Sequence, residues 1–171
     1  MRALILALLV ALTAAPLWAD PAPPEAGPGI ELVNIGIYCV PSETRQQAAP
    51  ETELGYINLY EGVPRFTHHR QTVPAILGLS FGVHFVADRD IAEVRVETWR
   101  PGAARPDAWP AALTAGSAQS NGFTFETTDE MQTGLWRMEA WDGSVLLYRV
   151  EFDVLPADAL PGIGPDCDLM S

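Results

Sequence analysis

The chain contains no lysine, and its acidic residues outnumber its basic residues. All 10 basic residues are arginine, against 22 aspartate and glutamate residues, and the formal net charge is −12. Nucleic acids and anionic membrane surfaces are bound through basic patches, so this balance argues against both as partners. A large net charge of one sign instead keeps a protein soluble through mutual repulsion.

Long apolar runs are missing except at the N-terminus. Arg2 precedes residues 3–15, which are apolar apart from one threonine, and Leu17-Trp18-Ala19 offers a cleavage site. This order is typical of a secretory signal peptide, and the apolar run is too short to span a bilayer. No cysteine follows the run to carry a lipid. We therefore predict a signal peptide at 1–19, no membrane anchor, and a periplasmic or secreted location.

The chain has only two cysteines, Cys39 and Cys167, which lie near the two ends of the predicted mature protein. In an oxidising compartment an even pair most simply forms a disulfide. Such a bond would close a loop around most of the domain, and the chain-entropy account assigns roughly 5 kcal/mol to a loop of that length. Two free thiols are the alternative. We predict the disulfide and no cofactor.

Helical patterns are absent after the predicted signal peptide, so we predict an all-β protein. Bulky apolar residues alternate with other residues over 30–39, 73–87 and 91–99, a period typical of half-buried strands. Short alternating strands separated by turn signals predict an immunoglobulin-like antiparallel β-sandwich.

Proline and glycine mark the limits of the predicted sandwich. Residues 20–29 are rich in both and predict a flexible leader, and residues 156–171 predict a C-terminal tail tied back by the disulfide. The sandwich domain then spans 30–155. Within it, residues 41–53 are polar and residues 101–120 show no period, so both segments are predicted as loops.

Two alternating stretches, 136–141 and 146–154, predict a hairpin near the C-terminus. A two-residue loop at Asp142-Gly143 would put their bulky apolar side chains on opposite faces. A three-residue loop at 141–143 puts them on one face and pairs Trp136 with Tyr148. We therefore predict the three-residue loop and a core position for Trp136.

Short motifs spread over most of the chain resemble those of a known family. They are Gly36-Ile37-Tyr38-Cys39, Thr72-Val73-Pro74-Ala75 with Gly78, Phe81-Gly82, Gly134-Leu135-Trp136 and Phe152-Asp153-Val154. In order and spacing they resemble an uncharacterised family of short exported bacterial proteins, a domain of unknown function seen in alphaproteobacteria. The resemblance covers about residues 31–167. It implies no activity and supplies no catalytic or binding residues.

Ser80 is a candidate nucleophile, because Gly78-Leu79-Ser80-Phe81-Gly82 matches the G-x-S-x-G elbow of hydrolases. His84 or His69 would be its base. The elbow needs a strand, a sharp turn and a helix that begins at the serine. Here the strand alternation continues past Ser80 to Ala87. We therefore expect Ser80 inside a strand, and a small serine hydrolase is an alternative function.

The three histidines, His68, His69 and His84, are candidate metal ligands, with Cys39 as a possible soft ligand. A zinc or copper site needs three or four ligands that converge on one point. Adjacent residues of an extended segment point to opposite faces, so His68 and His69 are poor partners. We expect no metal site, and a periplasmic metal-binding protein is a second alternative.

Trp99, Trp109 and Trp141 are the aromatic residues expected at or near the surface. Exposed aromatic side chains on a sandwich can bind sugars or a partner protein. Alternatively, the loop predicted at 101–120 folds over Trp99 and Trp109 and buries them. We take the three tryptophans as the candidate binding residues and assign no catalytic residue.

These observations predict a non-catalytic binding or interaction module of the bacterial cell envelope. Its expected partner is an envelope protein or a glycan, and it is not expected to be an enzyme. The hydrolase alternative requires that Ser80 meets a histidine in a cleft. The metal-binding alternative requires that the histidines cluster.

Overall fold

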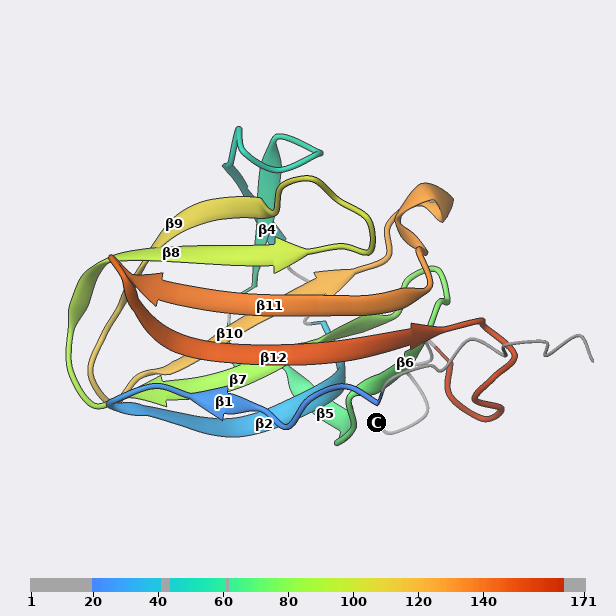
Figure 1. Cartoon of the computed structure of the whole chain (residues 1–171), viewed down its shortest axis with the longest axis horizontal. Coiled ribbons are helices and arrows are strands. Elements are labelled where there is room, and N and C mark those ends of the chain that lie inside the picture. The colour runs from blue at the N-terminus through green and yellow to red at the C-terminus, as the bar shows by residue number, and fades with distance from the viewer. Residues whose placement is uncertain (1–19, 41–43, 61, 165–171) are drawn as a thin grey trace, which may run out of the picture.

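The computed structural model describes residues 20–40, 44–60 and 62–164, which form a β-sandwich (Figure 1). The first sheet contains, in spatial order, β1 (Glu25–Ala26), β12 (Val145–Leu155), β11 (Gly134–Asp142), β8 (Ile91–Trp99) and β9 (Asp107–Leu113). β6 (Thr72–Pro74) runs parallel to β12. The second sheet contains β10 (Ala118–Thr124), β7 (Ser80–Ala87), β2 (Ile30–Cys39) and β5 (Arg65–His68).

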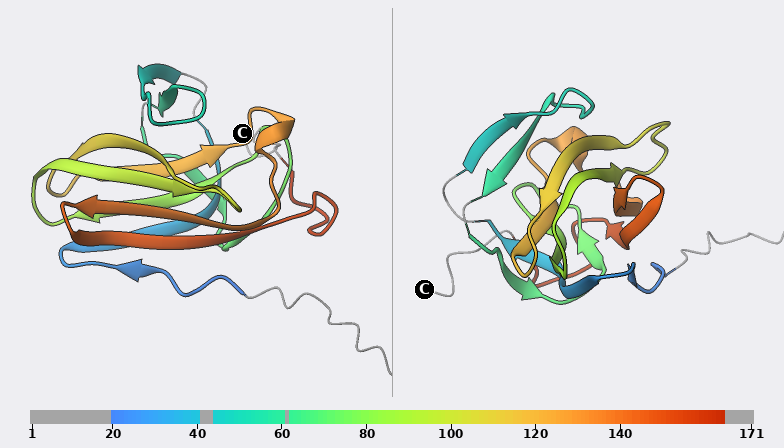
Figure 2. Two further views of the ribbon diagram at one scale, coloured as in Figure 1. Left: turned by 45° about the horizontal axis from the view of Figure 1, so that its top comes forward. Right: turned by 90° about the vertical axis from the view of Figure 1, so that its left-hand side faces the viewer.

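A separate hairpin, β3 (Thr44–Ala48) with β4 (Tyr56–Tyr60), stands off one side of the two sheets (Figure 2). The described part of the chain holds one helical element, a 3-10 turn at Thr128–Glu130. It contains no helix that is long and apolar enough to span a membrane. The expected all-β class is thereby confirmed.

The strand order is that of an immunoglobulin-like sandwich. In that fold strands A, B and E share one sheet, and strands C, F and G form the other. The second sheet of this chain brings β2, β7 and β10 together in the A, B and E positions. The first sheet brings β8, β11 and β12 together in the C, F and G positions, and β9 extends it beyond β8.

An aromatic cluster fills the space between the sheets. Phe81 of β7 packs edge-on against Trp136 of β11 with ring centroids 5.7 Å apart, and lies 5.1 Å from Phe152 of β12. Phe123 and Phe125 complete the cluster at 4.9 and 5.8 Å from Trp136. The Trp136 indole is fully buried, and its Nε1 donates to the Gln132 carbonyl at 2.8 Å. The largest core side chain therefore leaves no polar atom unpaired.

Three glycines stand opposite one another across the second sheet, Gly36 on β2, Gly82 on β7 and Gly122 on β10. A Cβ at Gly82 would collide with the Asn121 backbone, and a Cβ at Gly122 would collide with the Tyr38 hydroxyl. The row leaves space for the buried Tyr38 ring to reach from β2 to β10. Gly36, Tyr38 and Gly82 of the family motifs thus belong to one packed unit.

The leader predicted to be flexible is attached to the sandwich. Glu25–Ala26 pairs with β12, and the Gly27 amide donates to the Leu147 carbonyl at 2.8 Å. The Ala22 amide donates to the Glu151 carboxylate at 2.9 Å. The prediction is therefore wrong from Ala22 onward. The proline and glycine content of this segment predicted flexibility, but the segment is ordered because it pairs with the edge of β12.

Both segments predicted as loops contain strands. Residues 101–120 include β9 and the start of β10, and residues 41–53 include β3. β9 has no alternating pattern because it is an edge strand with Pro110 within it, a position where a missing amide is tolerated. Asn121-Gly122, a dipeptide typical of turns, lies inside β10.

The single strand predicted at 73–87 is two strands in different sheets. β6 pairs with β12, whereas β7 pairs with β2 and β10. The chain crosses between the sheets at 75–79, where Gly78 has a φ of 82° and Leu77 is half-exposed. The apolar alternation over 73–87 does not reveal this crossing, because the apolar residues of β6 and of β7 face the same core.

The C-terminal hairpin has a tighter turn than predicted. Asp142 pairs with Val145, and Gly143 adopts a φ of 57°. A bulge follows at Ala140 and Trp141, so Trp136 faces Phe152 instead of Tyr148. The predicted register is therefore wrong. The apolar side chains of both strands share one face because of the bulge, and not because of a three-residue loop. The core position of Trp136 is confirmed.

Some predictions concern residues outside the described part of the chain. The signal peptide at 1–19, Cys167 and the end of the tail at 165–171 belong here. Cys39 ends β2 and is partly buried. The signal peptide and the Cys39–Cys167 disulfide therefore stay predictions.

The aromatic cluster generates a stability test. Trp136→Ala should lower the free energy of unfolding by about 3–5 kcal/mol, because it opens a cavity among four rings and removes a hydrogen-bond donor. Trp141→Ala should cost less than about 1 kcal/mol, because that side chain lies on the outer face. Urea denaturation of the two variants measures both values. A larger loss in Trp141→Ala would contradict the assigned inner face.

Candidate functional site

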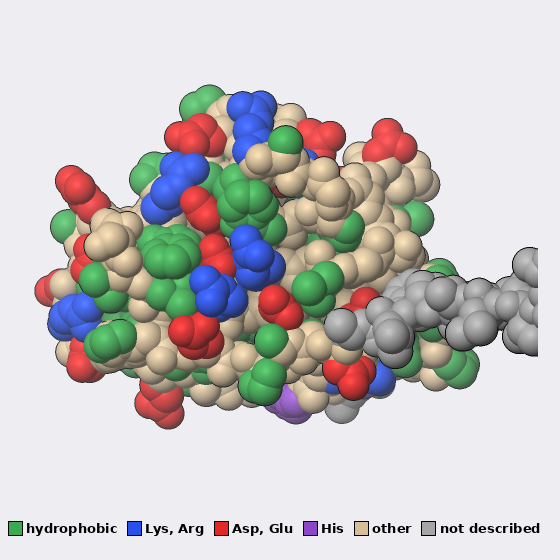
Figure 3. Space-filling view, in the orientation of Figure 1, with side chains coloured by type: hydrophobic (Ala, Val, Ile, Leu, Met, Phe, Trp, Pro, Cys, Tyr) green, Lys and Arg blue, Asp and Glu red, His purple; other side chains and the backbone are tan. Residues whose placement is uncertain are grey.

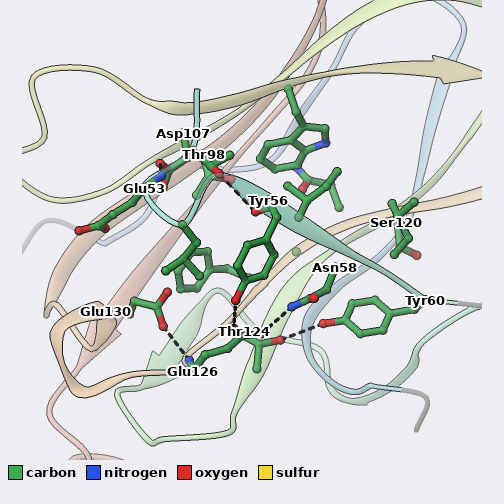
Figure 4. Close-up of a pocket in the computed structure, with 18 of the residues that line it drawn as sticks. Glu53, Tyr56, Asn58, Tyr60, Thr98, Asp107, Ser120, Thr124, Glu126 and Glu130 are labelled. Atoms are coloured by element: carbon green, nitrogen blue, oxygen red, sulfur yellow. Dashed lines mark hydrogen bonds between the residues drawn. The ribbon is translucent and has the colours of Figure 1, made fainter. Parts of the chain in front are cut away.

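A pocket of about 160 Å³ lies between the β3–β4 hairpin and the sandwich. The hairpin supplies one wall, β8 and β9 supply a second, and β10 with the segment after it supplies a third (Figure 4). The pocket therefore lies where one edge of each sheet meets the inserted hairpin. Binding sites commonly occupy such concave junctions between structural units.

The polar residues of β4 point into this pocket. Tyr56, Asn58 and Tyr60 occupy alternate positions of the strand and so share one face. Asn58 Nδ2 donates to Glu126 Oε1 at 2.5 Å, and the Tyr56 hydroxyl donates to Glu126 Oε2 at 3.4 Å (Figure 4). The Tyr60 hydroxyl lies 3.4 Å from Thr124 Oγ1. These contacts attach one side of the hairpin to the end of β10 and to the segment after it.

The other side of the hairpin is attached to β9. Glu51 forms an isolated backbone bridge with Ala108, and the Glu53 amide donates to Asp107 Oδ1 at 2.8 Å. Arg100 Nε pairs with Asp107 Oδ2 at 3.2 Å, and Arg100 also pairs with Glu53. Apart from these links, β3 and β4 make few close backbone contacts with the sandwich strands. Polar contacts thus attach both sides of the hairpin to the sandwich.

One end of the pocket is acidic. Glu126 is exposed, and Glu130 is buried with its Oε2 accepting from the Glu126 and Thr127 amides at 2.7 and 2.8 Å. Within the described residues neither carboxylate forms an ion pair. The negative charge of Glu126, more than burial, raises the pKa of the Tyr56 hydroxyl, and Glu130 adds to this effect.

Two residues that line the pocket each carry a buried oxygen with no hydrogen-bond partner. Thr98 on β8 is 1% exposed and Asn121 on β10 is 6% exposed, and both line the pocket. Asn121 Nδ2 donates to the Tyr148 hydroxyl at 2.9 Å, but Asn121 Oδ1 and Thr98 Oγ1 stay unpaired. An unsatisfied buried polar group costs about 1–3 kcal/mol. Such groups are rare in native proteins, and their presence in a pocket wall favours a binding role.

The structure separates the three candidate tryptophans. Trp109 lines the pocket, whereas Trp99 and Trp141 do not. Those two lie on the outer face of the first sheet, where hydrophobic, basic and acidic side chains alternate over β8, β11 and β12 (Figure 3).

The outer-face tryptophans are already engaged within the chain. Trp99 Nε1 donates to Glu97 at 3.0 Å, and Arg137 stacks 5.0 Å above the Trp99 ring. Trp141 Nε1 donates to Glu139 at 3.2 Å. Because their indole donors are satisfied internally, Trp99 and Trp141 are weaker candidates for binding than Trp109.

Ser80 lies inside β7 and is 2% exposed. Its Oγ is 2.8 Å from Thr124 Oγ1, and the strand continues beyond it without the turn and helix of a nucleophile elbow. His84, on the same strand, approaches the Asn34 side chain at 3.5 Å. This arrangement does not favour the hydrolase alternative.

The histidines do not converge. His68 Nδ1 lies 3.1 Å from the Thr67 hydroxyl, whereas the His69 and His84 rings each stack on Phe66 with centroids 6.4 Å from its ring. Burial lowers the pKa of His84. Among the described residues, no group of three histidine, cysteine or acidic side chains is placed to hold a metal ion.

Sequence reasoning missed most of the pocket. Residues 56–60 are predicted as a short extended segment, and their Tyr-x-Asn-x-Tyr alternation indicates that one of its faces is polar and aromatic. No local pattern, however, could show that this face meets Glu126, or that Thr98 and Asn121 would be left unpaired. Those relations arise only when β4, β8 and β10 are brought together.

Comparison with protein families gives a match over most of the chain. The model of a family described as a domain of unknown function, DUF3859, matches residues 27–154, which is more than half of the chain. A comparison with curated proteins found no match.

Comparison with solved structures gives alignments of low sequence identity. An immunoglobulin-like protein from Pseudomonas aeruginosa aligns with a TM-score of 0.48 and 19% identity, over 78% of this chain and 98% of that protein. A β-glucosidase from Erythrobacter marinus aligns with a TM-score of 0.30 and 15% identity, over 63% of this chain. A β-glucosidase from Listeria innocua gives 0.29 and 16%, over 64% of this chain. This chain spans 19% and 21% of the two glucosidases.

The tyrosines give a test of the pocket and of the packing behind it. Burial raises the pKa of Tyr38, Tyr60 and Tyr148 above the usual 10, and the charge of Glu126 raises that of Tyr56. The folded state therefore holds these protons more tightly than the unfolded state. The stability that they contribute is fully present below pH 10 and is lost as the pH rises through the folded-state values.

Absorbance at 295 nm, followed with circular dichroism from pH 8 to 13, measures this effect. We expect no tyrosinate step at pH 10, and ionisation of Tyr38 and Tyr148 only together with unfolding. Glu126→Gln should lower the pKa of Tyr56 and leave that of Tyr148 unchanged. Ionisation of all four tyrosines near pH 10 in a folded protein would contradict the structure.

Proposed function

Because the chain belongs to the DUF3859 family, whose function is unknown, its function has to be inferred from the site, and we propose a non-catalytic binding module. Its ligand would occupy the pocket between the β3–β4 hairpin and the sandwich. The observation that carries this proposal is that two residues lining the pocket, Thr98 and Asn121, each keep a buried oxygen without a hydrogen-bond partner. A ligand that hydrogen-bonds to them would offset a cost that the free protein bears.

The construction of the pocket supports binding more than catalysis. None of its described lining residues is a histidine or a cysteine, and Ser80 is not part of it. Glu126 and Glu130, its neighbouring carboxylates, accept hydrogen bonds from Asn58 and from backbone amides. Aromatic side chains with a few converging polar groups are typical of recognition sites.

The predicted signal peptide at 1–19 supports an envelope role. A protein exported by such a peptide works in the periplasm or outside the cell, where a disulfide between Cys39 and Cys167 would persist. The ligand would then be an envelope protein or a glycan.

A photo-crosslinking experiment in living cells tests the proposal. A benzophenone amino acid replaces Leu54, an exposed residue that lines the pocket. The matched control carries it at Leu77, which is 50% exposed against 44% for Leu54 but lies in the crossing between β6 and β7. We expect a discrete covalent adduct from position 54 that is absent from position 77.

Thr98→Val separates binding from folding in the same experiment. Valine has the shape of threonine without the unpaired hydroxyl, so the variant should be as stable as the parent or more stable. It should nevertheless weaken the position-54 adduct. Equal adducts from positions 54 and 77, or an adduct that Thr98→Val leaves unchanged, would contradict the proposed pocket.

A further inference from the structure

We propose that the pocket binds a ligand through a cationic nitrogen group that carries N–H donors, either a primary ammonium or a guanidinium. This inference rests on the proposed function and adds the chemical class of the ligand. It follows from the charge, the hydrogen-bonding capacity and the aromatic side chains of the pocket wall.

The charge left unneutralised in the pocket is negative. Arg100 is the one basic residue among the described lining residues, and it pairs with Asp107 and Glu53. Glu126 and Glu130 lie at a different part of the wall and accept hydrogen bonds only from neutral donors (Figure 4). A cation at this end would meet two carboxylates that have no counter-charge among the described residues. An anionic ligand would be repelled there.

The unsatisfied hydrogen-bonding capacity is mainly that of acceptors. An amide oxygen can only accept, so the unpaired Asn121 Oδ1 can be satisfied only by a hydrogen-bond donor. The carboxylates of Glu126 and Glu130 also only accept when they are ionised. The ligand should therefore bring N–H groups, which a quaternary ammonium group lacks.

The aromatic side chains suit the rest of such a ligand. Tyr56, Tyr60 and Trp109 line the pocket. A cation is attracted to the face of an aromatic ring, and Trp and Tyr are the residues that bind it best. The same rings, with Leu54, offer apolar surface to the stem that carries the charge. The overall charge of −12 further favours the approach of a cation over that of an anion.

This chemistry can come from two sources in the envelope. One is a lysine or arginine side chain of a partner protein, and the other is the free amino group of an amino sugar. Both present a nitrogen cation with N–H donors, so one set of probes can distinguish them.

Nuclear magnetic resonance titration of the ¹⁵N-labelled full domain tests the inference. The probes are Nα-acetyl-lysine methylamide with its neutral norleucine analogue, and glucosamine with neutral N-acetylglucosamine. The readouts are the indole N–H peak of Trp109 and the backbone amide of Asn58. We expect a cationic probe to bind about tenfold more tightly than its neutral analogue, which corresponds to one charge-assisted hydrogen bond. Trimethylation of the lysine probe should weaken its binding.

Two variants separate local charge from net charge. Glu126→Gln should weaken the cationic probe about tenfold and leave the neutral probe unchanged. Glu93→Gln removes the same charge from an exposed site on β8 that does not line the pocket, and should change neither. Tyr56→Phe, which keeps the Glu126 charge and removes one of its donors, should retain the preference for the cation.

Neutral analogues that bind as tightly as the cations would overturn this inference and leave the proposed function standing. The inference would also be overturned, and the proposed function left standing, if no probe shifts the Trp109 or Asn58 resonance while the position-54 adduct persists in cells. Loss of both the adduct and the titration would overturn the inference together with the proposed pocket.

Discussion

The packing of Phe81 against Trp136 fixes how the two sheets face each other, and the pocket depends on that arrangement. Immunoglobulin domains commonly join the B and F strands with a disulfide. This chain has no cysteine on β7 or β11 and places two rings there instead, 5.7 Å apart. Because Phe123, Phe125 and Phe152 pack around them, the contact is part of a continuous core. The same core holds β8 and β10, so the walls that carry Thr98 and Asn121 have a fixed separation.

The β3–β4 hairpin and the sandwich are stabilised by different kinds of interaction. The sandwich is held by buried rings, whereas the hairpin is attached by hydrogen bonds and ion pairs at Glu51, Glu53, Asn58 and Tyr60. Exposed polar contacts contribute little net stability each, since they exchange bonds with water. A site between the sandwich and the hairpin can therefore have one rigid wall, the sandwich, and one wall, the hairpin, whose local opening requires less free energy. The unpaired oxygens lie on the rigid wall, where they hold their positions without a ligand.

The sequence predicted the class of fold because alternation survives in the buried strands. Residues 30–39 and 91–99 form β2 and β8, and Trp136 lies in the core as expected. Prediction from the sequence failed for segments whose conformation depends on pairing with a neighbouring strand. The edge strand β9 shows no alternation of apolar and polar residues. At Gly78 the chain crosses from β6 to β7, but the apolar alternation continues through the crossing and hides it. The pocket was hardest to predict: Trp109 was identified as an exposed aromatic residue, but Asn58 and Glu126 are 68 residues apart in the sequence and meet only in the folded chain.

The central claim is that a rigid, ring-packed sandwich and a separately attached hairpin together form the binding site. Hydrogen–deuterium exchange of the backbone amides, read by nuclear magnetic resonance, tests it most directly. The account predicts that β7, β11 and β12 exchange only through global unfolding, while β3 and β4 exchange through a local opening of lower free energy. It further predicts that Trp136→Ala accelerates exchange in the sandwich strands and leaves the opening of the hairpin unchanged. A hairpin that exchanges with the same free energy as β7 and β11 would contradict the claim.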